Sequence, residues 1–130
     1  MRRRLLLGVA TLAALAAGGC GDNGTGGVAG DLVVSYFQAG AEPGAMLLTI
    51  TGGPVSKVTA VGGQQVSFAS PFSGTTKVVL LGNFGTGDLL HLTVPDVNQA
   101  TSYSVRVDQV ADKTTFALID PAGYTFTVHK

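Results

Sequence analysis

The sequence predicts an all-β fold, an antiparallel β-sandwich of about nine short strands. From residue 31 onward, apolar and polar residues alternate with a period of two, as they do in strands with one buried and one exposed face. These segments recur about every ten residues and are separated by turns that contain glycine or proline. The same part of the sequence has no apolar stripe with the period of an amphipathic helix.

Residues 1–19 are predicted to be a cleaved signal peptide that takes no part in the fold. Three arginines (2–4) come first, thirteen almost wholly apolar residues (5–17) follow, and small residues lead to Cys20. This order is the pattern of a secretory signal. A transmembrane helix is the less favoured interpretation, because a helix that crosses the hydrocarbon core needs about 20 apolar residues.

The end of this segment, Ala17-Gly18-Gly19-Cys20, resembles the lipobox of bacterial lipoproteins. In that family the signal peptidase recognises the residues before the cysteine, and its cut leaves the cysteine first and lipid-modified. Gly18 and Gly19 match the small residues of the lipobox, whereas Ala17 stands where leucine is usual. The resemblance implies a diacylglycerol thioether and an amide-linked third chain, such as palmitate, on Cys20. Two or more chains anchor a protein stably.

Cys20 also has a competing interpretation. It is the only cysteine of the sequence, so it cannot close an intramolecular disulfide. An odd cysteine in an exported protein indicates a free thiol, an intermolecular bond or a modification. Ordinary cleavage near residues 14–18 would leave a secreted, soluble protein with a free thiol. The lipobox favours modification and therefore predicts a membrane-anchored protein of the cell envelope.

Residues 20–30 are expected to form the lipidated cysteine and a glycine-rich tether. Five of the ten residues after Cys20 are glycine, which is the composition of a flexible linker. Gly21, rather than aspartate, follows the cysteine. By the resemblance to Gram-negative lipoproteins, this favours the outer membrane if the organism has one.

Residues 31–130 are expected to form the sandwich. Turn residues such as Gly62-Gly63, which readily adopt the positive φ of a hairpin turn, separate the strands. The first strand is expected to place Leu32, Val34 and Tyr36 on one face. The predicted strands are 31–38, 45–51, 55–61, 64–69, 76–81, 88–94, 103–110, 114–119 and 124–129.

Three segments, 44–50, 76–82 and 87–94, resemble strands of cohesin-like domains. Cohesin-like domains are nine-stranded jelly-roll sandwiches, related to a carbohydrate-binding superfamily, that dock protein partners in secreted assemblies. The resemblance covers residues 32–129 and rests on the rhythm of the strands. It implies a jelly-roll sandwich with a non-catalytic role in binding a protein or a glycan.

The charge of the mature chain argues against nucleic-acid binding. Once the three arginines leave with the signal peptide, five basic residues remain against eight acidic ones, which is a net charge of −3. The five are scattered along the sequence, whereas binding to phosphates needs clustered positive charge. No nucleic-acid partner is therefore expected.

The sequence of the predicted domain shows no motif for catalysis, for a metal or for a cofactor. Its two histidines, His91 and His129, fall on separate predicted strands, and Glu42 is its single glutamate. A catalytic histidine needs a nucleophile and an orienting acid beside it, and zinc needs three or four ligands. Asp96 and Asn98 supply two oxygens, whereas calcium takes six to eight. We therefore expect a protein that is not an enzyme and has no cofactor.

The candidate ligand-binding residues lie in two predicted loops. Phe72 and Phe84 are loop phenylalanines that either face solvent or cap an end of the sandwich, and Asn83 precedes Phe84. Sugars stack on exposed aromatic rings, but tryptophan is absent and the tyrosines fall in phase with core positions. The sequence thus predicts a lipid-anchored module that binds a protein or glycan in the envelope. The alternatives are a structural envelope lipoprotein without a dedicated ligand and a small secreted enzyme.

Overall fold

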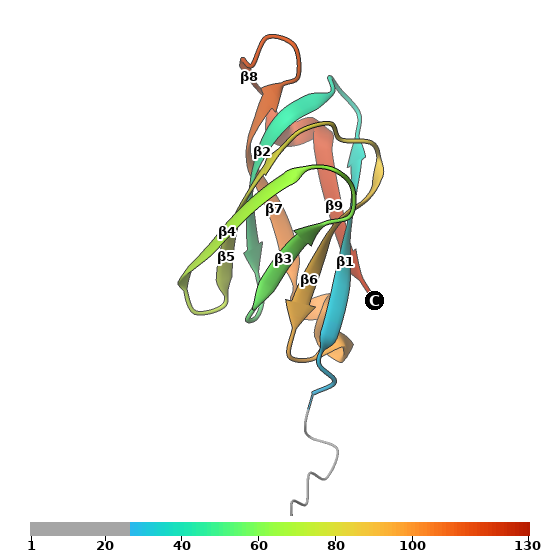
Figure 1. Cartoon of the computed structure of the whole chain (residues 1–130), viewed down its shortest axis with the longest axis vertical. Helices are drawn as coiled ribbons and strands as arrows, with labels where there is room; N and C mark the ends of the chain where they lie inside the picture. Colours follow the sequence, from blue (N-terminus) through green and yellow to red (C-terminus); the bar gives the residue numbers. More distant parts are fainter. Residues whose placement is uncertain (1–26) are drawn as a thin grey trace, which may run out of the picture.

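The computed structural model describes residues 27–130, which form a sandwich of two antiparallel β-sheets (Figure 1). The first sheet has four strands in the order β3-β6-β1-β9, and the second has five in the order β4-β5-β2-β7-β8. The prediction of an all-β sandwich is confirmed. The strands are β1 (Gly30–Gln38), β2 (Pro43–Thr51), β3 (Lys57–Ala60), β4 (Gln65–Phe72), β5 (Thr75–Leu81), β6 (Gly87–Val94), β7 (Ser104–Asp112), β8 (Leu118–Ile119) and β9 (Tyr124–His129), and the two 3-10 helices are η1 (Val97–Ser102) and η2 (Pro121–Gly123).

The core lies between the sheets and is built from the residues that alternate inward along each strand. On β1 the inward residues are Leu32, Val34 and Tyr36, as the sequence predicts, and on β2 they include Leu48 and Ile50. The other buried hydrophobic residues come from β2, β3, β5, β6, β7 and β9 and from the loops. They are Met46, Val55, Val58, Val78, Leu80, Phe84, Leu89, Leu90, Leu92, Val94, Tyr103, Val110 and Tyr124.

The three tyrosines belong to this core, as predicted from their alternation with the apolar residues of their strands. Their hydroxyl groups donate hydrogen bonds at the edge of the core. Tyr103 donates to the carbonyl oxygen of Pro54 at 2.8 Å, and Tyr124 donates to the carbonyl oxygen of Ala41. Burial raises the pKa of Tyr36 to about 12. All three rings are therefore removed from the surface.

Two β-bulges change the alternation that the sequence predicts. On β7 the extra residue is Asp108, and the next buried position after it is Val110. On β6 the extra residue is Leu89, so Leu89 and Leu90 are both buried, although strict alternation would turn Leu89 outward. A bulge places two residues opposite one on the partner strand and so changes the side to which the following side chains point.

The predicted strand 114–119 is wrong over most of its length, since β8 has only two residues. The carboxylate of Asp112 accepts hydrogen bonds from the backbone N–H groups of Thr114 and Thr115, both at 2.8 Å. Bonds of this kind from a side chain to nearby backbone hold the chain in a turn. Residues 113–117 therefore connect β7 to β8 instead of continuing a strand.

The sandwich has two ends, and the chain enters at one of them (Figure 1). The N-terminal end contains the start of β1, the end of β6, η1 and the β4–β5 hairpin. The opposite end contains the β1–β2, β5–β6 and β7–β8 connections. Val28 fixes the chain at the N-terminal end, because its N–H donates to the carboxylate of Asp96 at 3.2 Å and its carbonyl accepts from Val97 at 2.8 Å. The fold thus holds the chain before β1 begins.

Candidate functional site

A shallow apolar groove of about 230 Å³ lies on the outer face of the five-stranded sheet. Residues that pair across neighbouring strands point to the same side of a sheet. Ala45 on β2 pairs with Ala111 on β7, which pairs with Leu118 on β8, and Leu47 pairs with Val79 on β5. These five residues and Gln109 line the groove, which we call the outer-face groove.

The rim of the outer-face groove carries large apolar side chains that are open to solvent. Val79 is 41% exposed, and Leu81 and Leu118 are also exposed. Contiguous apolar surface on a soluble domain often marks an interaction site. The groove lies towards the opposite end of the sandwich from the one at which the chain enters.

Phe116 lies in the β7–β8 connection, two residues before Leu118. Its φ of 57° is the only positive φ of a non-glycine residue in the described chain, and its side chain is 73% exposed. A left-handed backbone costs about 1–2 kcal/mol for a residue that has a Cβ. A strained backbone that displays an aromatic ring to solvent motivates a functional hypothesis for that ring.

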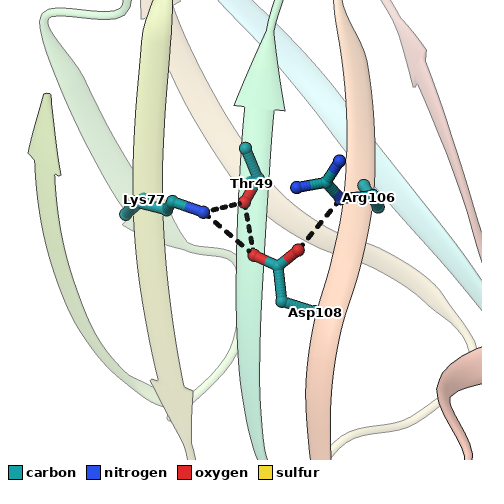
Figure 2. Close-up of polar contacts among 4 residues, drawn as sticks. All are labelled: Thr49, Lys77, Arg106 and Asp108. Atoms are coloured by element: carbon teal, nitrogen blue, oxygen red, sulfur yellow. Dashed lines mark hydrogen bonds and ion pairs between the residues drawn. The ribbon is translucent and has the colours of Figure 1, made fainter. Parts of the chain in front are cut away.

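Figure 2 shows a polar cluster of Thr49, Lys77, Arg106 and Asp108. It adjoins the groove on the same face, because Thr49 and Lys77 each lie two residues along their strands from the groove residues Leu47 and Val79. Lys77 Nζ lies 2.5 Å from Thr49 Oγ1 and 3.2 Å from Asp108 Oδ2. Arg106 Nε donates to Asp108 Oδ1 at 2.9 Å, and the Thr49 hydroxyl donates to Asp108 Oδ2. Thr49 is only 4% exposed although it points outward, because the other three side chains cover it.

The bulge in β7 gives Asp108 this position, and its neighbours stabilise its charge. Burial alone would raise the pKa of Asp108, but the hydrogen bonds from Thr49, Arg106 and Lys77 outweigh it and hold the pKa below its usual range. The cluster contains two cations and one carboxylate, so its net charge is +1. It therefore forms a cationic border on the groove.

Replacing Asp108 with asparagine is expected to weaken the acid sensitivity of the fold. A carboxylate whose pKa is lower in the folded state stabilises the protein above its unfolded pKa of about 4, and the contribution is lost as pH falls through the folded value. We expect D108N to cost about 1–2 kcal/mol at pH 7. Urea unfolding at pH 7 and below pH 4 checks this, and an equal loss of stability on acidification in both proteins would contradict it.

The outer face of the four-stranded sheet brings together Ser35 of β1, Asp88 of β6 and His129 of β9. Ser35 Oγ donates to Asp88 Oδ1 at 2.6 Å and lies 2.9 Å from His129 Nε2. His129 Nδ1 lies 2.9 Å from the carbonyl oxygen of Lys130. Sequence reasoning missed this grouping, because β1 pairs with β6 on one side and β9 on the other and so joins residues that are far apart in the chain.

The order of these three groups differs from that of a serine-hydrolase triad. In a triad the imidazole lies between hydroxyl and carboxylate and takes the hydroxyl proton. Here the hydroxyl of Ser35 lies between the other two groups and donates its hydrogen bond to Asp88 rather than to the imidazole. His129 Nε2 is 3.9 Å from Asp88 Oδ1, and both side chains are about half exposed. The geometry is that of an open polar cluster that links three strands.

The structure separates the loop residues that the sequence singled out. Phe72 is the last residue of β4 rather than a loop residue as predicted, and it is 73% exposed at the N-terminal end of the sandwich. Phe84 is buried and caps the core, so its ring does not face solvent. Asn83 is exposed in the β5–β6 connection, and its carbonyl oxygen accepts from Gln64 Nε2 at 2.7 Å. These residues do not form one site.

The lipobox residues Ala17, Gly18, Gly19 and Cys20 lie outside the described residues, so the anchor stays a prediction. Within residues 27–130, no helix is long and apolar enough to span a bilayer. In the same part of the chain, no three His, Cys, Asp or Glu side chains gather in a way that would hold a metal ion.

Comparison with protein-family models, curated proteins and solved structures finds no match to this chain. The resemblance to cohesin-like domains therefore stays an interpretation of the strand pattern. A functional assignment rests on the outer-face groove, on the charges beside it and on the N-terminal sequence.

Proposed function

We propose that the protein is a lipid-anchored component of a bacterial cell envelope whose β-sandwich binds a protein partner at the outer-face groove without catalysing a reaction. The observation that carries this proposal is the groove itself, an apolar hollow left open on an outer sheet face. The lipobox-like sequence that ends at Cys20 supports the anchor. The resemblance to cohesin-like domains, which dock protein partners, agrees with the proposed mode of action.

The chemistry of the groove favours a protein over a glycan. Its lining is almost entirely aliphatic, with Gln109 as its polar member. Glycans are held by exposed aromatic rings and hydrogen-bonding groups, and the three tyrosines that might stack on a sugar are buried. The partner that fits is a protein segment with a few apolar side chains, together with an acidic residue that meets Lys77 and Arg106.

Site-specific photo-crosslinking in living cells tests this proposal. A photoreactive residue in place of Val79 samples the groove, and one in place of Phe37, 58% exposed on the other sheet, is the matched control. We expect a discrete protein adduct from position 79, its loss when Leu118→Asp is added, and no such adduct from position 37. Equal labelling from both positions would overturn the proposal and favour a structural lipoprotein without a dedicated partner.

Replacing Phe116 with glycine separates partner binding from folding. Glycine adopts a positive φ without steric cost, so F116G is expected to stabilise the domain by about 1 kcal/mol or leave it unchanged. The same change removes an exposed ring two residues before Leu118, which lines the groove, and should lower the adduct yield from position 79. Thermal unfolding and the crosslinking assay measure the two effects, and a stabilised variant with undiminished crosslinking would show that Phe116 has no part in binding.

A further inference from the structure

We propose that the N-terminal end of the sandwich rests on the lipid surface that holds the anchor, with the β4–β5 hairpin in contact with the bilayer. This inference rests on the proposed lipid anchor and adds an orientation to it. Three observations support it: the length of chain between Cys20 and the fold, an exposed aromatic residue on the hairpin, and the distribution of charge between the two ends.

The first observation is the short connection to the anchor. Six residues, 21–26, separate Cys20 from Gly27, where the described chain begins. Even a fully extended chain advances only about 3.5 Å per residue, so Gly27 lies within about 25 Å of Cys20. A side chain at Gly27 would meet Asp96 Cβ at 2.5 Å and the carbonyl oxygen of Pro95 at 2.7 Å, which shows how closely the chain lies against this end. The anchor therefore keeps the N-terminal end near the membrane.

The second observation is the β4–β5 hairpin at the same end. Phe72 is 73% exposed beside Pro71, and it pairs with Thr75 at the turn. Thr75 pairs in turn with Thr51, and the next residue, Gly52, packs against Ser102 at the end of η1. The hairpin tip thus lies at the end where the chain enters. An exposed apolar ring next to a lipid anchor has a bilayer interface available to bury it.

The third observation is a difference in charge between the two ends. Among residues 27–130, the side chains of the N-terminal half include four basic residues against three acidic ones, whereas the opposite half has one basic residue against four acidic ones. Asp22, in the connection to Cys20, adds one negative charge on this side, and the N-terminal half together with that connection is three charges more positive than the opposite half. The first set is Lys57, Lys77, Arg106 and Lys130 with Asp31, Asp96 and Asp108, and the second is Lys113 with Glu42, Asp88, Asp112 and Asp120.

This asymmetry gives the domain a preferred orientation on an anionic bilayer. Lys57 and Lys130 lie at the N-terminal end itself, where a basic side chain near such a surface contributes about 1 kcal/mol, and the acidic side chains of the opposite half are repelled. Lys77 and Arg106 lie farther from this end, at the border of the groove, and are left to the partner. The N-terminal end therefore faces the lipid, and the outer-face groove, which lies towards the opposite end, faces away and is free for its partner. The partner would approach from the aqueous side rather than along the membrane.

A fluorescent probe on each end of the lipidated protein tests the orientation. Because the single native cysteine is acylated in this proposal, an added cysteine is the only reactive thiol. Ser73→Cys labels the hairpin tip and Thr114→Cys labels the β7–β8 connection, and both positions are exposed. In vesicles of phosphatidylcholine with phosphatidylglycerol, brominated lipids should quench the probe at 73 at least about twofold more than the probe at 114. Adding Phe72→Ser to Ser73→Cys should reduce this difference.

The outcomes distinguish failure of the orientation from failure of the anchor. A protein that does not float with the vesicles lacks the anchor, and the proposed function then fails. A protein that floats but shows equal quenching at the two positions is anchored without a preferred orientation, which overturns the inference alone. A probe at 73 that is shielded from water in cells but unquenched by lipid would show that a protein covers the hairpin, which also overturns it.

Discussion

Replacing Gly52 with alanine is expected to destabilise the domain by at least about 3 kcal/mol. Gly52 follows β2 with a φ of 111°, and a Cβ there would lie 1.8 Å from the carbonyl oxygen of Ser102. The backbone of Tyr103 is also close, with its Cα at 2.9 Å. Since the contacting atoms are backbone, neither can rotate away, and η1 would have to move. Urea unfolding of the domain, monitored by circular dichroism, measures the loss.

Gly85 is the matched control for this substitution. It lies in the β5–β6 connection outside the left-handed region, and a Cβ added there would meet nothing within 4 Å. G85A should change the free energy of unfolding by no more than about 0.5 kcal/mol. Similar losses in G52A and G85A would contradict the close packing of η1 against the end of β2.

Replacing Leu48 with alanine is expected to cost about 3 kcal/mol, within the range measured for buried leucines. Leu48 is fully buried and lies on β2, which has β5 on one side and β7 on the other. Close packing on both sides leaves little room for the strand to shift and fill the cavity. Chemical denaturation gives the change in stability, and an unchanged m-value would show that the unfolding transition itself is preserved.

Leu81 provides the control on the neighbouring strand. It has the same side chain as Leu48 but points outward from β5 and is exposed at the rim of the groove. L81A should cost less than about 1 kcal/mol, because little apolar surface loses its burial. If L81A cost as much as L48A, the assignment of inner and outer faces to this sheet would be contradicted.

The fold was predictable from the sequence where local pattern and tertiary packing agree. The alternation on β1 correctly placed Leu32, Val34 and Tyr36 in the core, and the glycines and prolines correctly separated most strands. The bulges were not predictable, since an extra residue such as Asp108 follows from the pairing of β7 with β2 rather than from the pattern of either strand. The turn at residues 113–117 was not predicted either. There, the hydrogen bonds from the backbone N–H groups of Thr114 and Thr115 to the Asp112 carboxylate outweigh the weak alternation of apolar and polar residues.

The candidate site was less predictable than the fold. The outer-face groove is made of outward residues from β2, β5, β7 and β8, and each of them looks like an ordinary exposed strand position when its strand is considered alone. Sequence reasoning therefore turned to the loops, where Phe84 proved to be buried and Phe72 proved to be exposed. The order of the strands in the sheet was the missing information, because it decides which outward side chains become neighbours.

The mass of the N-terminal peptide of the protein extracted from its own cell envelope tests the proposed anchor most directly. The lipoprotein assignment predicts a peptide that begins at Cys20 and carries a diacylglycerol thioether and an amide-linked acyl chain. It further predicts that Cys20→Ala loses this mass and moves the protein from the membrane fraction to the soluble fraction. A mature chain that begins elsewhere, or that begins at Cys20 with an unmodified thiol, would contradict the assignment.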